Sequence, residues 1–347
     1  MNEPVTVSIV VPVYKVEAYI RRCLDSLSNQ TYPHLQIIVV NDGSPDQSGE
    51  IAEEYARLDS RIEVVHQLNQ GLSGARNTGI QYAHGFYSMY VDSDDWIEIN
   101  AVEKMLHLAL ETKADIVQSN FYYAYENRNM VDYRFLQKER SPTVLSNEEA
   151  VRELVSNKKV KNFAWGKMYR TTLIKNIPFQ EGRLFEDVVW AYRVMENVSL
   201  LVLVSEPLYY YMQRSTSITA DYTPRNLDFI KGLTERHEMM KVNYPGLADA
   251  SNRELLRASL LHYHLLFFHR KKDEKGYHRK ELRRFIDERF SSFEQAASDE
   301  PHLYRQLKFF HYHPFLNLCF LGLRKGFRKL KLIPSPEGLQ PAEPGKG

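Results

Sequence analysis

Three carboxylates lie within four positions of the segment Tyr90-Val91-Asp92-Ser93-Asp94-Asp95-Trp96. The apolar residues 86–91 lead into them, and the Val and Tyr residues of this run favour a strand. Carboxylates this close repel one another unless a cation lies between them, and hard oxygen ligands suit Mg²⁺ or Mn²⁺. The segment also fits a solvated acidic turn that caps the next helix, because Asp is common at helix N-caps. The spacing alone is compatible with both interpretations.

The elements that must position these acids alternate between strands and helices. Continuous β-branched runs predict buried strands, and apolar residues at three- and four-residue spacing predict helices. The predicted strands are 5–11, which Pro12 ends, 35–40, 62–65 and 86–91. The predicted helices are 17–30, 46–58 and 75–83. This order predicts an α/β fold with a mostly parallel sheet, helices on its faces, and the loops after the strands at one edge.

The pattern changes in the second half of the chain. A helix at 101–112 and a strand at 115–122 extend the sheet, and 126–137 fits a polar hairpin or insertion. Ser146-Asn147-Glu148-Glu149 is a capping box that opens a helix to 157. A helix at 186–194 and strands at 199–204 and 208–212 follow. Beyond a boundary near Tyr222 the pattern is helical at 225–241, 252–270, 279–290 and 303–311, and 334–347 is predicted to be disordered.

Composition limits the classes of protein. Hydrophobic residues make up 43% and charged residues 26% of the chain, as in ordinary globular proteins. The net charge of +1 gives no argument for a nucleic-acid partner. Cys23 and Cys319 lack metal-ligand spacing and are expected to be buried thiols. No window approaches the ~18 apolar residues of a membrane span, and the first apolar run reads as a strand rather than a signal peptide, so we expect a cytoplasmic protein.

The turn after the first predicted strand excludes two nucleotide-binding classes. It reads Pro12-Val13-Tyr14-Lys15, without the glycines of a dinucleotide-binding turn, and the P-loop spacing is absent from the chain. Backbone groups at 12–14 could still meet a base edge, with Tyr14 over its face, and Asp42 could accept a hydrogen bond from a base N–H. Asn41-Asp42-Gly43-Ser44 also fits a simple turn with a Ser N-cap.

Four short motifs occur in order in the first 95 residues: Val7-Ser8-Ile9-Val10-Val11-Pro12-Val13-Tyr14, Asn41-Asp42-Gly43-Ser44, Gly74-Ala75-Arg76-Asn77-Thr78-Gly79 and Asp92-Ser93-Asp94-Asp95. Together they resemble glycosyltransferase family 2, which has the GT-A nucleotide-diphospho-sugar transferase fold. The resemblance continues loosely to about Thr219 through 165–170, 185–187 and 209–211. It implies a catalytic domain at 1–222, with a nucleotide-binding half (1–125) and an acceptor half (126–222), followed by a helical region at 223–333.

The resemblance also implies residue roles. The nucleotide- and donor-binding residues would be Pro12, Val13, Tyr14, Asp42, Arg76, Asn77, Asp92, Ser93, Trp96 and Arg214. Asp94 would hold the metal, with Asp92 or Asp95 as possible further ligands, and Asp42 would read uracil. Asp187 would be the catalytic base, oriented by Glu186. Asp187 also fits a helix start that favours acids, and Arg76 fits an ordinary surface ion pair.

The reaction implied by the resemblance is inverting transfer of one sugar from a nucleotide-sugar, with UDP-sugars favoured through Asp42. The acceptor would be a glycan or lipid-linked saccharide in cell-surface polysaccharide synthesis. Mn²⁺ or Mg²⁺ would neutralise the leaving diphosphate, and Asp187 would take the proton of the acceptor hydroxyl. The Q-x-x-R-W motif and membrane spans of processive members are absent. Two alternatives are a sugar-nucleotide pyrophosphorylase and a non-catalytic glycan-binding or scaffold protein.

Residues 314–332 alternate apolar and basic side chains at helical spacing. This pattern fits a helix on an anionic membrane surface, and it also fits a terminal helix that packs on the helical region. Because the acceptors of many family members are lipid-linked, we expect peripheral attachment to the cytoplasmic face of the membrane.

Overall fold

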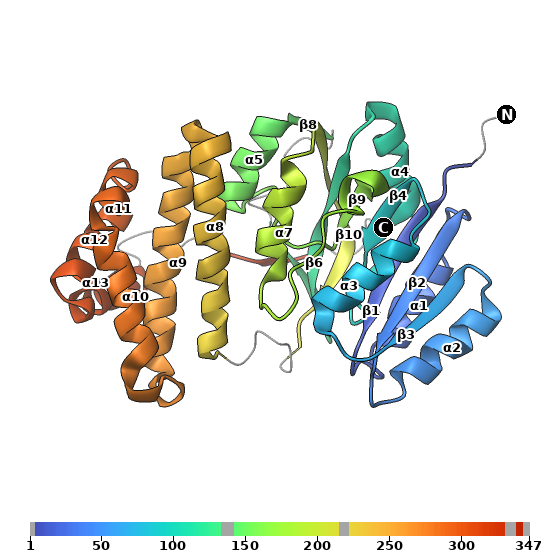
Figure 1. Ribbon diagram of the computed structural model, residues 1–347, viewed down its shortest axis with the longest axis horizontal. Coiled ribbons are helices and arrows are strands. Elements are labelled where there is room, and N and C mark those ends of the chain that lie inside the picture. Colours follow the sequence, from blue (N-terminus) through green and yellow to red (C-terminus); the bar gives the residue numbers. More distant parts are fainter. Residues whose placement is uncertain (1–3, 133–141, 215–221, 330–337, 343–347) are drawn as a thin grey trace. The chain divides into compact units, whose positions relative to one another are not determined.

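The computed structural model describes residues 4–132, 142–214, 222–329 and 338–342 (Figure 1). It contains two compact units, Met1–Ser215 with Leu339–Gly347 and Thr216–Gly338. The domain boundaries predicted from the sequence, 1–222 and 223–333, stay a prediction.

One mixed sheet forms the centre of the first unit. Its strands are β1 (Val7–Val13), β2 (Leu35–Asp42), β3 (Ile62–Gln67), β4 (Tyr87–Tyr90), β5 (Trp96–Ile97), β6 (Ile116–Tyr125), β7 (Arg128–Val131), β8 (Thr143–Ser146), β9 (Lys167–Arg170), β10 (Leu200–Met212) and β11 (Gln340–Pro341). The main order is β11-β7-β6-β9-β4-β1-β2-β3, and β10 pairs with β5, β6 and β8. Strands β1 to β4 are parallel, as predicted, whereas β9 is antiparallel to both β4 and β6. Strands β6 and β10 also pair in parallel, so β9 separates two parallel parts of the sheet.

Helices cover both faces of this sheet. They are α1 (Ile20–Ser28), α2 (Ser48–Leu58), α3 (Gly71–Tyr82), α4 (Ala101–Thr112), α5 (Asn147–Ser156), α6 (Thr171–Ile174) and α7 (Glu186–Met195). Ile9 and Val11 of β1 belong to a core shared with α1, α2 and α4. Val10 points to the other face, where a Cβ at Gly79 of α3 would come within 2.3 Å of its Cγ1. The alternation of side chains along β1 thus places α3 directly on the second face.

Strand β10 is continuous where two strands were predicted. Its register with β6 shifts between Val204 and Pro207 and again before Tyr209, so the predicted break is a bulge. Beyond the bulge, Tyr209 and Tyr210 pair with β5, a short strand that the sequence did not predict. The bulge therefore carries the C-terminal part of β10 past the acidic turn at 92–95.

Three further expectations differ from the structure. Pro12 lies inside β1, opposite Val40; the register with β4 ends at Val10, so its missing N–H breaks no bond on that side. Cys23 is buried as expected, but Cys319 is exposed. Within the tail predicted to be disordered, β11 pairs with the edge strand β7, while 334–337 and 343–347 lie outside the described residues.

The second unit is helical, as predicted. Its α-helices are α8 (Asp228–Asn243), α9 (Ala248–Phe268), α10 (Tyr277–Glu288), α11 (Phe290–Ala296), α12 (Pro301–Tyr312) and α13 (Pro314–Lys329). Helix α9 packs against α8, α10 and α11, and α13 packs against α12. Among the helices of the described ranges, none is both long and apolar enough to cross a membrane.

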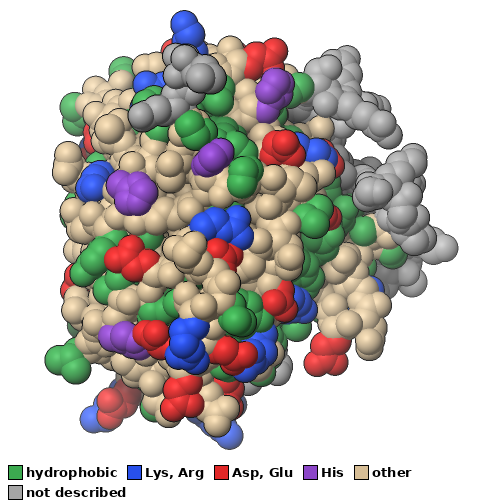
Figure 2. Space-filling view, turned by 90° about the vertical axis from the view of Figure 1, so that its right-hand side faces the viewer, with side chains coloured by type: hydrophobic (Ala, Val, Ile, Leu, Met, Phe, Trp, Pro, Cys, Tyr) green, Lys and Arg blue, Asp and Glu red, His purple; other side chains and the backbone are tan. Residues whose placement is uncertain are grey.

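Charge is evenly mixed on the face drawn in Figure 2. Acidic, basic and histidine side chains lie next to one another there, with small apolar areas between them. This mixture agrees with the net charge of +1 and gives no single-sign patch on that face.

Candidate active site

The acidic turn follows β4 and is fastened to β10. Asp95 is fully buried, and its carboxylate accepts hydrogen bonds from the Tyr209 hydroxyl (2.6 Å) and the Met212 N–H (2.8 Å). The Tyr209 oxygen in turn accepts the N–H of Asp92 at 3.2 Å. Burial, reinforced by Asp94 and Asp92, raises the pKa of Asp95 well above its usual range. Because its oxygens face the sheet, the geometry favours a supporting role for Asp95 over metal ligation.

We expect Asp95→Ala to lower the free energy of unfolding by about 1–3 kcal/mol for each donor left without an acceptor. The two donors are the Tyr209 hydroxyl and the Met212 N–H, both buried with the carboxylate. Urea denaturation measures the loss, with the exposed Glu63→Ala as a control on the same sheet. Equal stability of Asp95→Ala and the control would contradict this role.

Asp92 and Asp94 have carboxylates that are not committed to the sheet. Asp92 Oδ1 lies 2.8 Å from Arg76 Nη2, and Asp94 Oδ2 lies 2.6 Å from Arg214 Nη2. Burial and the neighbouring Asp92 raise the pKa of Asp94. Ser93 between them is buried. Two neighbouring acids of like charge are each stabilised by an arginine.

The described residues contain no cluster of three or more His, Cys, Asp or Glu side chains arranged to hold a metal ion. A pair of carboxylates is nevertheless the usual protein share of a Mg²⁺ site, because that ion keeps waters and binds substrate phosphates. Asp92 and Asp94 fit this kind of site, in which most ligands come from outside the chain.

Arg76 joins the acidic turn to Glu186, the neighbour of the predicted catalytic base Asp187. It is buried on α3 at 3% exposure, and its Nη1 lies 2.7 Å from Glu186 Oε1 at the start of α7. Phe185, just before, has a φ of 58°, which is a strained backbone conformation for an aromatic residue. The ion pair and this conformation fix the first turn of α7 against α3.

Asp187 is partly buried beside this pair. Burial, together with the Glu186 carboxylate, raises the pKa of Asp187 to about 7. Lys167 of β9 is buried nearby, and its ammonium donates to the carbonyls of Lys161 (2.5 Å) and Phe163 (2.6 Å). Burial lowers the pKa of Lys167 to about 7, opposed by Asp187. The sequence analysis assigns no role to Lys167. The one feature that could have indicated a role is its position in 165–170, a segment that resembles the family.

Asp42 ends β2 and holds the loop that leads into α3. Its Oδ1 accepts from the Gln67 amide (2.7 Å) and the Gln70 N–H (2.8 Å), and Oδ2 accepts from the Gly71 N–H (2.8 Å). These bonds explain why α3 begins at Gly71 rather than at the predicted residue 75. The carboxylate keeps acceptor capacity on Oδ2, so base recognition by Asp42 stays a prediction.

The other predicted nucleoside residues lie on the same edge of the sheet. Pro12 and Val13 are buried in β1, and Tyr14 follows them with 43% of its surface exposed. The Lys15 ammonium lies 5.2 Å from the centre of the Tyr14 ring. An exposed aromatic face at the carboxyl end of β1 agrees with the predicted contact to a base, which is not otherwise tested.

The side chains of Asn77 and Trp96 make contacts with other parts of the protein. The Asn77 amide donates to the Phe179 carbonyl (2.9 Å) and accepts the Phe179 N–H (2.7 Å). Trp96 stacks on Tyr210 at 4.8 Å between centres and 8° between planes, and the Arg22 guanidinium lies 3.5 Å from the centre of its ring. Because Tyr210 and Arg22 already cover its ring, the partly exposed Trp96 is poorly placed to stack on a sugar, which argues against the predicted stacking role.

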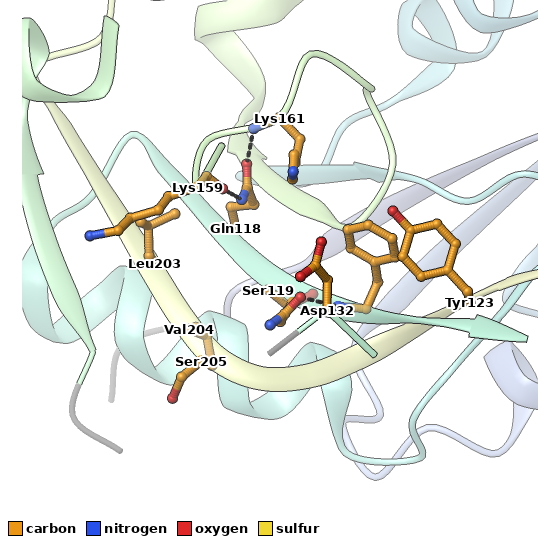
Figure 3. Close-up of a pocket in the computed structure, with 11 residues that line it drawn as sticks. Gln118, Ser119, Tyr123, Asp132, Lys159, Lys161, Leu203, Val204 and Ser205 are labelled. Atoms are coloured by element: carbon orange, nitrogen blue, oxygen red, sulfur yellow. Dashed lines mark hydrogen bonds between the residues drawn. The ribbon is translucent and has the colours of Figure 1, made fainter. Parts of the chain in front are cut away.

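A small hollow lies over β6 beside the β10 bulge (Figure 3). It is lined by Gln118, Ser119, Asn120, Phe121, Tyr123, Asp132, Lys159, Lys161, Leu203, Val204 and Ser205. The Gln118 amide accepts the Lys161 N–H and donates to the Lys159 carbonyl, which holds the loop before β9 over the hollow. None of the sequence-predicted site residues lines it.

Comparisons with known proteins identify related sequences. A family model described as Glycosyl transferase family 2 matches residues 8–170. Glycosyltransferase GlyA of Streptococcus pneumoniae is 36% identical over 261 residues, which are 73% of this chain and only 38% of GlyA. The uncharacterized glycosyltransferase EpsJ of Bacillus subtilis is 37% identical over 258 residues, which are 72% of this chain and 73% of EpsJ.

The fold has a solved counterpart. The crystal structure of S. aureus TarS 1–349 in complex with UDP-GlcNAc superposes with a TM-score of 0.66 and covers 87% of this chain and 90% of that chain. The two sequences are 22% identical, so this likeness concerns the fold alone.

Proposed function

The chain belongs to glycosyltransferase family 2 and has the GT-A fold, and we propose that it transfers one sugar from a nucleotide-sugar to a saccharide acceptor with inversion at the sugar carbon. The observation that carries this proposal is the pair of contacts made by the Arg76 guanidinium. It contacts Asp92 of the acidic turn and Glu186, which precedes the proposed base Asp187. Two groups of acids that are far apart in sequence thereby meet at one edge of the sheet. Such a pair of sites is what displacement at a sugar carbon requires.

A divalent cation is part of the proposal. Asp92 and Asp94 would hold Mn²⁺ or Mg²⁺, which when bound neutralises the charge that develops on the leaving diphosphate. Arg214, paired with Asp94, would add positive charge on the same side. The donor's base would lie against Tyr14, at the end of β1.

Asp187 would act from the acceptor side. Its carboxylate would take the proton of the attacking hydroxyl as the new bond forms opposite the leaving group. Glu186, held by Arg76, would keep the first turn of α7 in place. A carboxylate whose pKa is raised to about 7 by burial and by Glu186 is a stronger base than an exposed one, and it is still ionised in part at neutral pH.

Turnover at saturating donor should rise with pH and have its midpoint near pH 7. Asp187 must be deprotonated to act, so protonation below its raised pKa removes the base. Initial rates between about pH 5.5 and pH 8.5 test this, with UDP binding measured at each pH as the control. A midpoint near pH 4, or a parallel change in UDP affinity, would contradict it.

The direct test of the function is a screen of nucleotide-sugars with Mn²⁺ or Mg²⁺, scored by release of the nucleoside diphosphate. UDP-GlcNAc is the first donor to try, because TarS, which shares the fold, is solved in complexes with UDP-GlcNAc and UDP. Failure of every donor, together with unchanged nucleotide binding in Asp94→Ala, would refute the proposal. A pyrophosphorylase would instead need a basic glycine-rich loop where this chain has residues 12–15.

We also propose peripheral attachment to an anionic membrane through the segment predicted at 314–332, of which α13 is described and 330–332 lie outside the described residues. From residue 301 to 336 the sequence has seven Lys or Arg and no Asp or Glu. Helix α13 turns buried Pro314 and Asn317 towards the protein. The side chains of α13 that are exposed at three- and four-residue spacing are Phe315, Leu316, Cys319 and Leu323. The segment has basic but no acidic side chains. Its exposed stripe of apolar residues could contact lipid tails while its Lys and Arg residues contact anionic headgroups.

We expect Phe315→Glu/Leu323→Glu to lower co-sedimentation with phosphatidylglycerol vesicles by about tenfold or more, because each substitution puts an acid in the exposed stripe. The matched control is Val242→Glu, an exposed apolar residue on α8 of the same unit. Binding to phosphatidylcholine vesicles should be weak for all three proteins. Undiminished binding of the double variant would contradict attachment through this stripe.

A further inference from the structure

We propose that Arg76 is a positioning residue that joins the acidic turn to the first turn of α7, and that it is not a ligand for the nucleotide-sugar. The sequence resemblance would place Arg76 beside the nucleotide and donor sugar. The proposal rests on the proposed function for what the two joined segments do, but the bridge itself is a property of the fold.

The guanidinium of Arg76 is committed to the protein. Nη2 lies 2.8 Å from Asp92 Oδ1 and Nη1 lies 2.7 Å from Glu186 Oε1. Nε is buried without a hydrogen-bond partner among the described residues, and the whole side chain is 3% exposed. A ligand could reach this group only after one of the two ion pairs had opened.

The two ion pairs connect segments that are distant in the sequence. Asp92 follows β4, whereas Glu186 lies 110 positions from Arg76 in the sequence and opens α7. Nearby contacts strengthen the second connection: Ser73 donates to the Gln180 carbonyl at 3.0 Å, and Asn77 holds both backbone groups of Phe179. Helix α3 is thus the element against which the segment 179–186 is set, with Arg76 as its charged contact.

The two ion pairs require the planar guanidinium of an arginine. Arg presents several N–H groups in a fixed plane and can bind two carboxylates in different directions, while the Lys ammonium is a single point of charge on a flexible stem. Arg76→Lys therefore keeps the charge but is expected to hold one carboxylate and release the other. Misplacement of a reacting group by about 1 Å costs about 100-fold in rate.

The functional arm of the test compares Arg76→Lys with the wild-type chain. With UDP in the absence of a divalent cation as the probe, the dissociation constant should change by less than about threefold, while turnover at saturating donor with Mg²⁺ falls by about 100-fold. Arg21→Met, which removes an exposed ion pair with Glu54, is the control. A loss of UDP affinity as large as the loss of turnover would show that Arg76 binds the donor and would overturn the proposal.

The structural arm does not depend on activity. Arg76→Met leaves the carboxylates of Asp92 and Glu186 without their cation, so its urea midpoint should be well below that of the wild type. Arg76→Met/Glu186→Gln should recover part of this loss, because one of the stranded charges is gone. A double variant no more stable than Arg76→Met would overturn the bridge. If the wild type binds no UDP, the proposed function fails, and this comparison still decides the role of Arg76.

Discussion

Asp187→Asn is expected to lower turnover at saturating donor by about 10²–10⁴-fold, the usual contribution of a general base. Asparagine has nearly the same shape but cannot accept the proton of the attacking hydroxyl. The residue lies at the start of α7, beside Glu186 and Lys167, at the Glu186 end of the Arg76 bridge. Single-turnover measurement of nucleotide release, with donor and acceptor both saturating, gives the effect.

Two measurements separate loss of the base from loss of structure. UDP affinity should stay within about threefold of the wild-type value, because Asp187 does not lie in the acidic turn, and Glu63→Gln on β3 controls for loss of a carboxylate. The remaining activity should lose the pH dependence centred near 7. Full activity in Asp187→Asn would mean that another group takes the proton.

The sequence was sufficient for the parallel part of the fold. Residues 7–13 and 35–42 are buried throughout, so their β-branched runs reflect a strand covered on both faces. Helix α4 has the predicted bounds, 101–112, because its apolar spacing and its packing agree. Strands β5 and β8 were missed since they are short and are held by pairing with β10, a contact distant in sequence.

The candidate site was predicted as a set of residues but not as a set of contacts. Arg76, Asp92 and Glu186 were each identified by their motifs, yet no local pattern indicates that one guanidinium joins the other two. Asn77 and Trp96 show the opposite case. Their side chains are polar or aromatic as a ligand site requires, but long-range neighbours in the fold, the Phe179 backbone and the Tyr210 ring, already occupy them.

The three neighbouring acids of the turn differ in the contacts that their side chains make. The family resemblance assigns the metal to Asp94 and leaves Asp92 and Asp95 as possible further ligands. In the structure the turn directs Asp95 to Tyr209 and Met212, while the other two meet arginines. The alternation of side chains about a tight turn decides which carboxylate is structural. A prediction of the metal ligands therefore needs the position of β10, which joins the turn from more than a hundred residues away.

Asp94→Asn should weaken the binding of UDP with Mn²⁺ by about 10–100-fold and lower turnover by a further large factor, because one of the two carboxylates proposed to hold the cation loses its charge. UDP binding without metal should change much less. The substitution also leaves Arg214, whose Nε is already buried without a partner among the described residues, with a weaker contact. Calorimetric titration with and without Mn²⁺ measures both affinities.

Asp95→Asn is the informative comparison for this result. Its side chain faces Tyr209 and Met212, so it should lose stability rather than metal-dependent affinity. A variant at 94 that binds UDP with Mn²⁺ as tightly as the wild type, or a variant at 95 with the larger metal defect, would reverse the assignment of the two acids. The cation would then have to lie on the sheet side of the turn, where Asp95 is fully buried, and this would require the C-terminal part of β10 to move.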